Sequence, residues 1–515
     1  MKRWLIRLAP FAILLISALA LAWVRLVREA DGQANFLLSV VIVGVAGILL
    51  FAWVLLLSGL RARTRVKLLV VTILLAALLV ALLRIDGVSG DLVPIIRWRF
   101  SPRAEAILPG IPSPPRPPDP GVSTAGAGAR LDYPQFLGPS RDATVKGARL
   151  ARDWSRSPPR PLWRRKTGAG WSGFAVAGDA AFTQEQRGDL ELVTCHALLT
   201  GDVRWSHSDP TRYETVIGGV GPRATPTVTE DRVYTLGGTG LLNCLERERG
   251  ARRWARDVMK ESGSDVNEWG MSGSPLVLGR LVIVSPGGTK DRSLAAYDRE
   301  TGEPVWTGGT ARAGYSSPLH AVIQGDSQVL ILNRASVAGH DAATGKVLWE
   351  RPWPGASPSA AQPLPLPGDR VLVSSGYGVG CALFQIEKGA EAGLHARELW
   401  KNRNLKAKFA NFVHKDGFVY GLDDGILVCL DVETGERRWK GGRYGHGQMI
   451  LVEDLLLVTA ESGEVALIEP VPAGHRELGR FEALEGKTWN SPAFAAPYLL
   501  VRNAEDAACF ELALE

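Results

Sequence analysis

One short pattern recurs five times in this sequence and constrains its fold more than any other feature. In residues 429–439, a small residue, Cys429, is followed by five residues and Gly435, then by three more residues and Trp439. The same spacing recurs at Cys195/Gly201/Trp205, Cys244/Gly250/Trp254, Ala296/Gly302/Trp306 and Gly339/Gly345/Trp349. A spacing repeated without change indicates one structural unit that the chain uses several times.

Each copy is predicted to be a β-hairpin. Residues before the turn, such as Leu427 and Val428, favour a short strand. Asp431 favours the start of a turn, and Gly435 supplies the positive φ that a tight reversal requires. The chain then returns through Trp439, whose large apolar ring can fill the gap between neighbouring sheets.

The two ends of the repeat region complete the set of hairpins. Two looser copies return at Trp400 and Phe481. Residues 509–512 form a leading strand with no returning partner, whereas residues 161–163 form a returning strand with nothing before it. We expect these two strands to pair as an eighth hairpin, which is how a ring of sheets is closed.

The spacing of the returning aromatic residues indicates the architecture. They lie 39 to 52 residues apart, which is the period of a four-stranded propeller blade. Between them recurs a small or polar residue followed by Pro or an apolar residue, as in Thr225-Pro226 and Ser274-Pro275. We expect these segments to enter the innermost strands. The sequence therefore predicts an all-β domain over residues 132–515, an eight-bladed β-propeller with four-stranded antiparallel blades.

Three apolar runs make residues 1–85 a predicted α-helical membrane region. They cover residues 8–24, 36–60 and 68–83, and a helix needs about 17–25 apolar residues to cross a bilayer. The second run contains 25 residues and no charge. The first run has a basic start and an alanine-rich end, so it fits either a spanning helix, which we favour, or a cleaved secretory signal.

The loop between the second and third runs sets the orientation. It contains Arg61, Arg63, Arg65 and Lys67 without an acidic residue, so the positive-inside rule holds it in the cytoplasm. The propeller is then expected on the periplasmic side of a bacterial inner membrane. Residues 86–131 are expected to be a Pro/Gly/Ala-rich linker. Its first part mixes apolar, aromatic and basic residues and fits either a segment in the headgroup region or a coil.

Several classes of function lack support in the sequence. Four of the five cysteines share one repeat position, which indicates small apolar residues packed inside blades. The eight histidines show no ligand spacing, so no metal site is predicted. The net charge of +6 is partly held by the membrane flanks and is not interleaved with aromatic residues, so no nucleic-acid partner is expected. We predict no catalytic residue.

The segments that enter the innermost strands carry the candidate binding residues. These are Trp171, Arg223, Trp269, Tyr315, Lys408, Arg443, Tyr444, His446, Trp489 and Asn490, with Glu185, Arg187, Glu268, Lys406 and Lys487 as polar neighbours. Side chains from different blades would converge on one mouth of the central channel. Such a set suits a flat anionic or polar ligand, or a peptide segment. The alternative is that these residues cap the channel and satisfy one another.

The hairpin over residues 427–439 resembles the repeat of the pyrroloquinoline-quinone-like (PQQ-like) β-propeller superfamily, as do the copies at 296–306 and 339–349. The lead-in at 134–142 resembles the segment before the propeller in many bacterial members. The superfamily includes quinone-dependent dehydrogenases, which hold the quinone beside calcium and an Asp base, and non-enzymatic members such as the propeller lipoprotein of outer-membrane protein assembly. This chain has neither the adjacent cysteine pair of many of these dehydrogenases nor the lipobox cysteine of the lipoprotein.

From these features we expect a membrane-anchored, periplasm-facing propeller that acts as a non-catalytic binding or scaffold module and needs no cofactor. Its expected partners are the lipid bilayer and a protein of the cell envelope. The alternative is a PQQ-dependent dehydrogenase that uses calcium and oxidises alcohols or sugars. An enzyme should show an open funnel with carboxylates converging on a metal-sized gap. A scaffold should show an aromatic or basic rim and a plugged channel.

Overall fold

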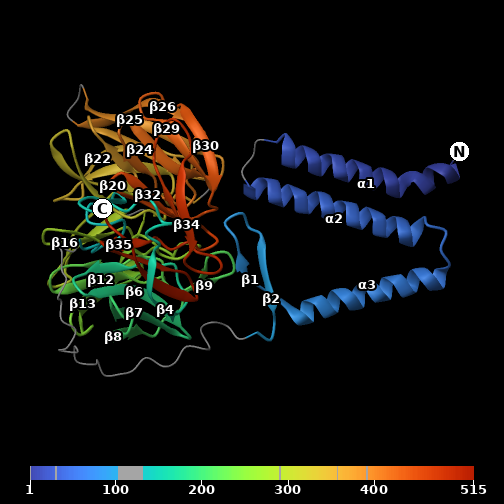
Figure 1. Cartoon of the computed structure of the whole chain (residues 1–515), viewed down its shortest axis with the longest axis horizontal. Coiled ribbons are helices and arrows are strands. Elements are labelled where there is room, and N and C mark those ends of the chain that lie inside the picture. Colours follow the sequence, from blue (N-terminus) through green and yellow to red (C-terminus); the bar gives the residue numbers. More distant parts are fainter. Residues whose placement is uncertain (1, 29–31, 102–130, 289–291, 356–357, 390–392) are drawn as a thin grey trace. The chain divides into compact units, whose positions relative to one another are not determined.

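The computed structural model describes residues 2–28, 32–101, 131–288, 292–355, 358–389 and 393–515. The chain divides into two compact units, Met1–Pro102 and Arg103–Glu515 (Figure 1). The first unit is mainly helical, and the second is built from β-sheets.

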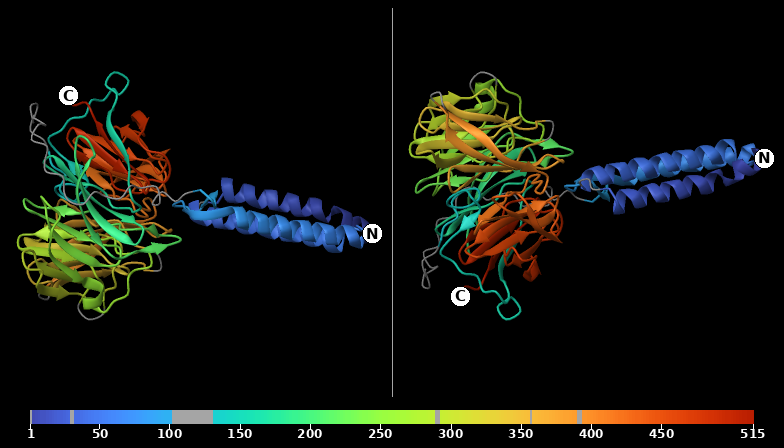
Figure 2. Two further views of the ribbon diagram at one scale, coloured as in Figure 1. Left: turned by 90° about the horizontal axis from the view of Figure 1, so that it is seen from below. Right: turned by 90° about the horizontal axis from the view of Figure 1, so that it is seen from above.

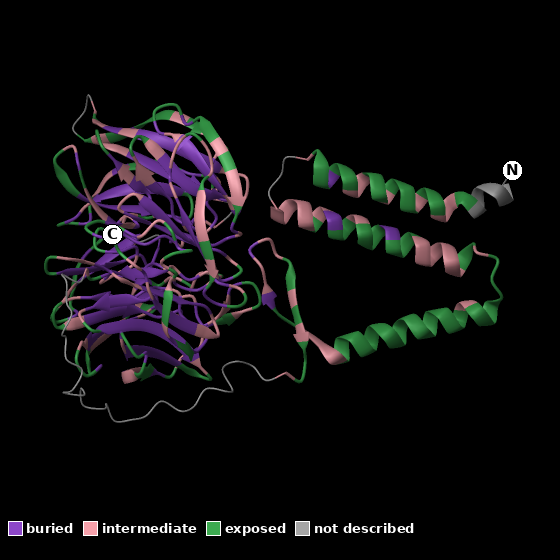
Figure 3. Ribbon diagram, in the orientation of Figure 1, coloured by how far each residue is buried: buried purple, intermediate pink, exposed green. Residues whose placement is uncertain are grey.

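The first unit contains three long helices. They are α1 (Lys2–Leu26), α2 (Gly32–Leu56) and α3 (Ala62–Leu82), and α1 packs against α2. Leu8–Leu26, Gly32–Leu56 and Ala62–Leu82 are each long and apolar enough to cross a membrane. Their surfaces are largely exposed, in contrast to the buried strands of the second unit (Figure 3). The third helix begins six residues before the predicted apolar run, so Arg63, Arg65 and Lys67 lie in its first turns rather than in a loop.

A β-hairpin follows α3 directly. Strand β1 (Leu83–Val88) pairs antiparallel with β2 (Pro94–Trp98), and Leu83 lies opposite Trp98. The predicted linker began at residue 86, and this prediction is wrong for residues 86–98. The branched and aromatic residues of this segment pair across a turn instead. Residues 102–130 of the predicted linker lie outside the described residues.

The second unit forms an eight-bladed β-propeller of four-stranded antiparallel blades, as predicted. Blade 1 contains β5 (Ala175–Ala177), β6 (Ala180–Arg187), β7 (Leu190–Ala197) and β8 (Val203–Asp209); blade 2 contains β11 (Thr227–Val228), β12 (Arg232–Leu236), β13 (Leu241–Glu246) and β14 (Arg252–Asp257), followed by the short helix α5 (Val258–Ser262). Blade 3 contains β15 (Leu276–Leu278), β16 (Leu281–Val284), β17 (Leu294–Asp298) and β18 (Pro304–Gly308); blade 4 contains β19 (Leu319–Ile323), β20 (Asp326–Leu332), β21 (Ser336–Asp341) and β22 (Val347–Pro352).

The remaining four blades repeat the same order. Blade 5 contains β23 (Leu364–Leu366), β24 (Arg370–Ser375), β25 (Gly380–Lys388) and β26 (Leu394–Asn402); blade 6 contains β27 (Val413–Lys415), β28 (Phe418–Asp423), β29 (Ile426–Asp431) and β30 (Arg437–Arg443). Blade 7 contains β31 (Gln448–Val452), β32 (Leu455–Thr459), β33 (Glu464–Ile468) and β34 (Glu477–Glu482); blade 8 contains β35 (Ala493–Ala495), β36 (Tyr498–Arg502), β37 (Asp506–Glu511) and β4 (Arg160–Lys166). First strands of neighbouring blades contact one another, as β5 does with β11 and β35, so these strands line the axis.

In five blades, the returning tryptophan packs against the repeat glycine of the next blade. Trp205 of blade 1 lies opposite Cys195, and its indole Nε1 donates to the carbonyl oxygen of Arg247 in blade 2 at 2.9 Å. A Cβ added at Gly250 of blade 2 would lie 2.3 Å from the Trp205 ring. The same close approach occurs for Trp163/Gly201, Trp254/Gly302, Trp306/Gly345 and Trp400/Gly435. The prediction that the tryptophan fills the gap between sheets is therefore confirmed.

The ring closes by pairing the two ends of the domain. In blade 8, β4 pairs with β37, and Trp163 lies opposite Cys509. The predicted eighth hairpin is confirmed. Because one blade is built from both ends of the domain, the ring cannot open without breaking this strand pair.

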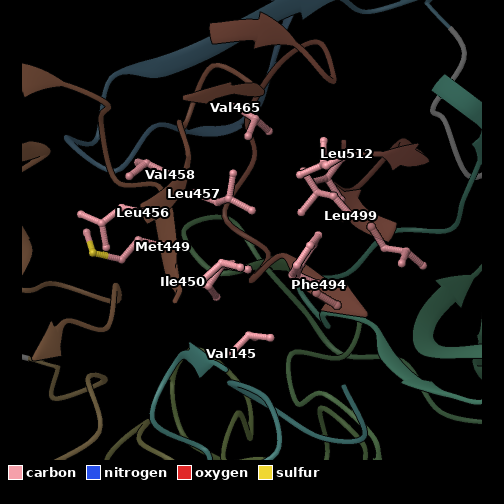
Figure 4. Packing of buried hydrophobic residues seen from close by; sticks show 14 of the residues in the cluster. Val145, Met449, Ile450, Leu456, Leu457, Val458, Val465, Phe494, Leu499 and Leu512 are labelled. Carbon is pink, nitrogen blue, oxygen red and sulfur yellow. The ribbon is translucent and has the colours of Figure 1, made fainter. Parts of the chain in front are cut away.

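The largest buried apolar cluster lies where the ring closes. Figure 4 shows part of it, with Ile450 and Leu457 of blade 7 near Phe494 of blade 8. All five cysteines are buried and free of disulfides. Burial raises the pKa of Cys195 to about 12, so this thiol is protonated and unreactive at neutral pH.

Candidate functional site

The lead-in to the propeller enters the central channel from the end where the first strands finish. Tyr133 forms a bridge with Val176 at the middle of β5, and the amide of Val228 in β11 donates to the carbonyl oxygen of Pro134 at 2.8 Å. The chain then turns back as β3 (Thr144–Val145), which runs parallel to β31. Residues 133–145 therefore form a loop against the innermost strands, which we call the plug.

Arg141 is the innermost anchor of the plug. Its side chain is 2% exposed, and its two terminal nitrogens donate to the carbonyl oxygens of Ser274 and Pro275, each at 2.9 Å. The Nε2 of Gln362 donates in turn to the Arg141 carbonyl oxygen at 3.0 Å. These partners come from blades 3 and 5, so the plug is tied to separate parts of the ring. Burial lowers the pKa of Arg141 to about 9.

Aromatic side chains gather at the other end, where the first strands begin. The rings of Trp171 (before β5) and Trp489 (before β35) have centroids 4.9 Å apart. Trp489 also lies 4.9 Å from Phe409, which lies 5.5 Å from the ring of His446. The Nζ of Lys487 stands over both indoles, 4.7 Å from Trp171 and 4.2 Å from Trp489. Blades 1, 6, 7 and 8 thus contribute to one continuous contact.

The contact continues across the mouth of the channel. The buried Nζ of Lys408 lies 3.5 Å from Nε2 of His446 and 5.4 Å from the centre of the Tyr377 ring. Tyr377 belongs to the turn between β24 and β25, and its ring lies 6.4 Å from that of Trp269. Trp269 in turn lies 5.6 Å from Tyr315. Side chains from blades 3, 4, 5 and 6 therefore join the same network, which we call the cap.

A small hairpin completes the cap beside Trp171. Strands β9 (Glu214–Thr215) and β10 (Gly219–Val220) form it, and the carbonyl oxygen of Gly218 accepts from Trp171 Nε1 and from Arg223 Nη2, both at 2.8 Å. Burial lowers the pKa of Arg223 to about 10. At the tip, Val216 and Ile217 are 72% and 40% exposed. The cap therefore presents an apolar tip next to aromatic and cationic side chains.

Three of the ten predicted site residues lie apart from the cap contacts. Asn490 is buried and donates from Nδ2 to the carbonyl oxygen of Ser172 at 2.8 Å, a contact between blades 8 and 1. The phenol of Tyr444 donates to Glu477 of β34 at 2.6 Å. Arg443 is the last residue of β30, opposite Ile426. Residues 440–443 continue β30, so Arg443 does not lie in a segment that enters an innermost strand.

The cap also contains residues that were not predicted from the sequence. Phe409 follows Lys408 directly, and Tyr377 lies between two glycines in the turn between β24 and β25. Glu461, between β32 and β33, accepts from Trp489 Nε1 at 2.9 Å and from the His446 amide at 3.0 Å. A bulky aromatic residue inside a glycine run was the available signal for Tyr377. Glu461 carried no signal, because it lies in the turn between the second and third strands of blade 7, where no repeat position marks it.

The side chains at the channel contact one another through aromatic rings, cation–π pairs and hydrogen bonds. Within the described ranges, no group of three His, Cys, Asp or Glu side chains is placed to hold a metal ion. The carboxylate of Glu191 is buried and accepts from the Gly238 amide at 2.9 Å. Its pKa is raised to about 7, chiefly by burial. A separate hollow of about 500 Å³ is lined by Ala311, Arg312, Arg334, Ala335, Ser336, Glu350 and Pro352.

Comparison with known proteins agrees with this architecture. The family described as outer membrane protein assembly factor BamB matches residues 190–441, which span six of the blades in whole or in part. Over this stretch the chain is similar to propellers of the PQQ-like repeat type. The outer membrane protein assembly factor BamB of Shewanella oneidensis is 24% identical over 351 residues, 66% of this chain and 76% of that protein.

Two solved structures show the same fold. The crystal structure of BamB from Moraxella catarrhalis superposes with a TM-score of 0.52 and 17% identity, covering 68% of this chain and 97% of that one. The quinohemoprotein alcohol dehydrogenase of Comamonas testosteroni gives a TM-score of 0.52 and 11% identity, covering 74% and 80%. BamB and an alcohol dehydrogenase thus share this fold, so the fold alone does not assign a function.

Proposed function

We propose that this chain is a membrane-anchored, non-catalytic binding or scaffold module whose PQQ-like propeller faces the periplasm and holds a protein of the cell envelope. The observation that carries the proposal is the filling of the channel, by the plug at one end and the cap at the other. Arg141 is tied to Ser274, Pro275 and Gln362, which precede the innermost strands of blades 3 and 5. The match to an assembly-factor family supports a protein as the partner.

The residues of the channel do not fit pyrroloquinoline quinone and calcium. Calcium takes six to eight oxygen ligands, several of them carboxylates. The described residues around the cap place aromatic rings, Lys408 and Lys487 there, and the carboxylate of Glu461 is occupied by Trp489 and His446. A flat cofactor would have to displace rings that already contact one another. We therefore derive no redox step for this chain.

We expect no change in the thermal midpoint of the full-length protein, in detergent, when pyrroloquinoline quinone and calcium are added together. A ligand at 100 times its dissociation constant would stabilise the folded state by about 2.7 kcal/mol. Differential scanning fluorimetry resolves such a shift, and dye reduction with alcohols and sugars measures turnover. A purified quinoprotein dehydrogenase is the positive control. A saturable shift that requires both ligands, with dye reduction, would contradict the proposal.

Site-specific photocrosslinking tests for the partner. A photoreactive residue at Val216, on the exposed tip of the cap hairpin, is expected to give one discrete adduct with an envelope protein in intact cells. The matched control is Val322 in β19, which is 65% exposed and belongs to blade 4. An adduct that weakens about tenfold when Trp489→Ala is added would tie binding to the cap. Equal labelling from both positions, or none from Val216, would refute a partner at this face.

A further inference from the structure

The hairpin after α3 has one apolar face. Its cross-strand pairs Leu83–Trp98 and Ile85–Ile96 place four apolar side chains on the same side of the two-stranded sheet. Ile85 and Ile96 are each 60% exposed, and Trp98 is 49% exposed. Phe100, just beyond β2, is 70% exposed, and its ring lies 6.1 Å from that of Trp98. Such a face is unfavourable in water.

The opposite face of the hairpin is cationic. Arg84 lies opposite Arg97, and both pair with one carboxylate, that of Asp86. The Nε–O distances are 3.2 Å for Arg84 and 3.4 Å for Arg97. Two guanidinium groups share a single acid, so this face keeps a positive charge. Arginine forks bind phosphate oxygens well.

Arg99 fixes the hairpin to the end of α3. Its Nη2 donates to the carbonyl oxygens of Val80 at 2.8 Å and Leu83 at 3.2 Å. The backbone amide of Arg99 donates to the carbonyl oxygen of Leu82 at 2.8 Å. The last carbonyls of a helix have no partner within the helix, and they carry partial negative charge. An arginine at this position therefore satisfies them and sets the angle at which the hairpin leaves α3.

The turn of the same hairpin reaches the start of α2. A Cβ added at Gly32, the first residue of α2, would lie 2.6 Å from the Asp91 carboxylate. The C-terminal end of α3 and the N-terminal end of α2 must lie on the same side of a membrane that both helices cross. The hairpin bridges these two ends (Figures 1 and 2). It is thus held at the level where the apolar helices stop.

We propose that β1 and β2 form an interfacial anchor that lies on the periplasmic surface of the bilayer. Ile85, Ile96 and Trp98 enter the boundary of the acyl chains, and Arg97, whose side chain is 40% exposed, contacts lipid phosphates. We infer lipid as the occupant because the apolar face continues the apolar surface of α3. That helix has no buried residue along its length, and the apolar face of the hairpin begins at the next residue. Tryptophan and arginine are the residues expected at this depth. The inference rests on the membrane anchoring in the proposed function.

Depth-dependent quenching in proteoliposomes tests this anchor. An Ile96→Cys variant of the full-length chain, labelled with the fluorophore NBD, is reconstituted in vesicles of phosphatidylethanolamine and phosphatidylglycerol. The native cysteines are buried, so the label goes to the introduced thiol. We expect a blue-shifted emission, quenched most by a spin label carried about 5–10 Å below the phosphates. The matched variants are Val322→Cys on the propeller and Leu74→Cys within α3.

The three positions separate the possible outcomes. The anchor is supported if the shallow lipid label quenches the fluorophore at Ile96 and a deeper label quenches it at Leu74. The fluorophore at Val322 should then be quenched only by aqueous iodide. Quenching at Leu74 with iodide-only quenching at Ile96 overturns the anchor while leaving the membrane-spanning helices in place. Loss of lipid quenching at Leu74 as well overturns the membrane anchoring itself. Replacing phosphatidylglycerol with neutral lipid is expected to reduce quenching at Ile96 and not at Leu74.

Discussion

Replacing Gly250 with Ala is expected to lower the free energy of unfolding of the propeller by about 2–5 kcal/mol. Gly250 has φ +68°, a conformation that costs about 1–2 kcal/mol for a residue with a Cβ. The new methyl group would also lie 2.3 Å from the Trp205 ring. Displacing the indole would strain its 2.9 Å bond to Arg247, and overpacking of this kind adds about 1–3 kcal/mol. Urea denaturation followed by tryptophan fluorescence measures the loss.

A second glycine separates the two causes. Gly279, in the turn between β15 and β16, has φ +57°, and nothing lies within 4 Å of a Cβ added there. Gly279→Ala should therefore show only the backbone cost of about 1–2 kcal/mol. Adding Trp205→Ala should remove the clash at Gly250 but leave a cavity, so the two losses would not be additive. We call the contact between the repeat tryptophan of one blade and the repeat glycine of the next, such as Trp205 and Gly250, the blade seam. Equal effects of Gly250→Ala and Gly279→Ala would contradict a role of the blade seam in stability.

The blade seam explains why the fold could be predicted from the sequence. The glycine of the repeat satisfies two conditions, a positive φ and a close approach by a tryptophan ring, and each excludes other residues. The spacing between Gly250 and Trp254 therefore could not drift between copies. The closure of the ring could also be predicted, because the strands at 161–163 and 509–512 each matched one half of the repeated hairpin.

The candidate site was predicted less completely, for physical reasons. Trp171, Trp269 and Trp489 precede innermost strands, so their register along the repeat placed them at one mouth. Tyr377 enters from the turn between second and third strands, where no repeat position marks it. Tyr444 occupies a segment of the expected kind, but the preceding strand β30 runs longer and turns its phenol towards Glu477.

The plug could not be predicted from residue types. Arg141 resembles any surface arginine in the sequence, and only the fold shows that it is buried against backbone carbonyls. The β1–β2 hairpin was missed for a related reason. Its strands are short, and Gly87 falls inside β1 rather than at the turn, so the segment lacked a clear hairpin signal.

Replacing Arg502 with Met is expected to destabilise the closed ring by about 3–5 kcal/mol. Arg502, on β36 of blade 8, is 1% exposed and donates to the carbonyl oxygens of Gln184 at 2.7 Å and Gly168 at 2.9 Å. Both carbonyls would lose a donor in a buried place. Glu185, which is fully buried in β6, would keep its ion pair with Arg187 but would lose the charge interaction with Arg502. Thermal unfolding of the full-length variant measures the loss, with Arg502→Lys as the control that keeps the charge.

The loss on removing Arg502 should also depend on pH. Burial opposes ionisation of Glu185, but Arg187 and Arg502, with hydrogen bonds from Thr167 and Gly168, hold its pKa below the usual 4.5. An acid with a lowered pKa stabilises the folded state above its unfolded pKa, and this stabilisation is lost as pH falls through the folded pKa. Without Arg502 the pKa of Glu185 rises. The difference between wild type and Arg502→Met should therefore be largest near pH 7 and smaller below pH 4.5. A difference that stays constant from pH 7 to pH 3 would show that Arg502 acts through its carbonyl contacts alone.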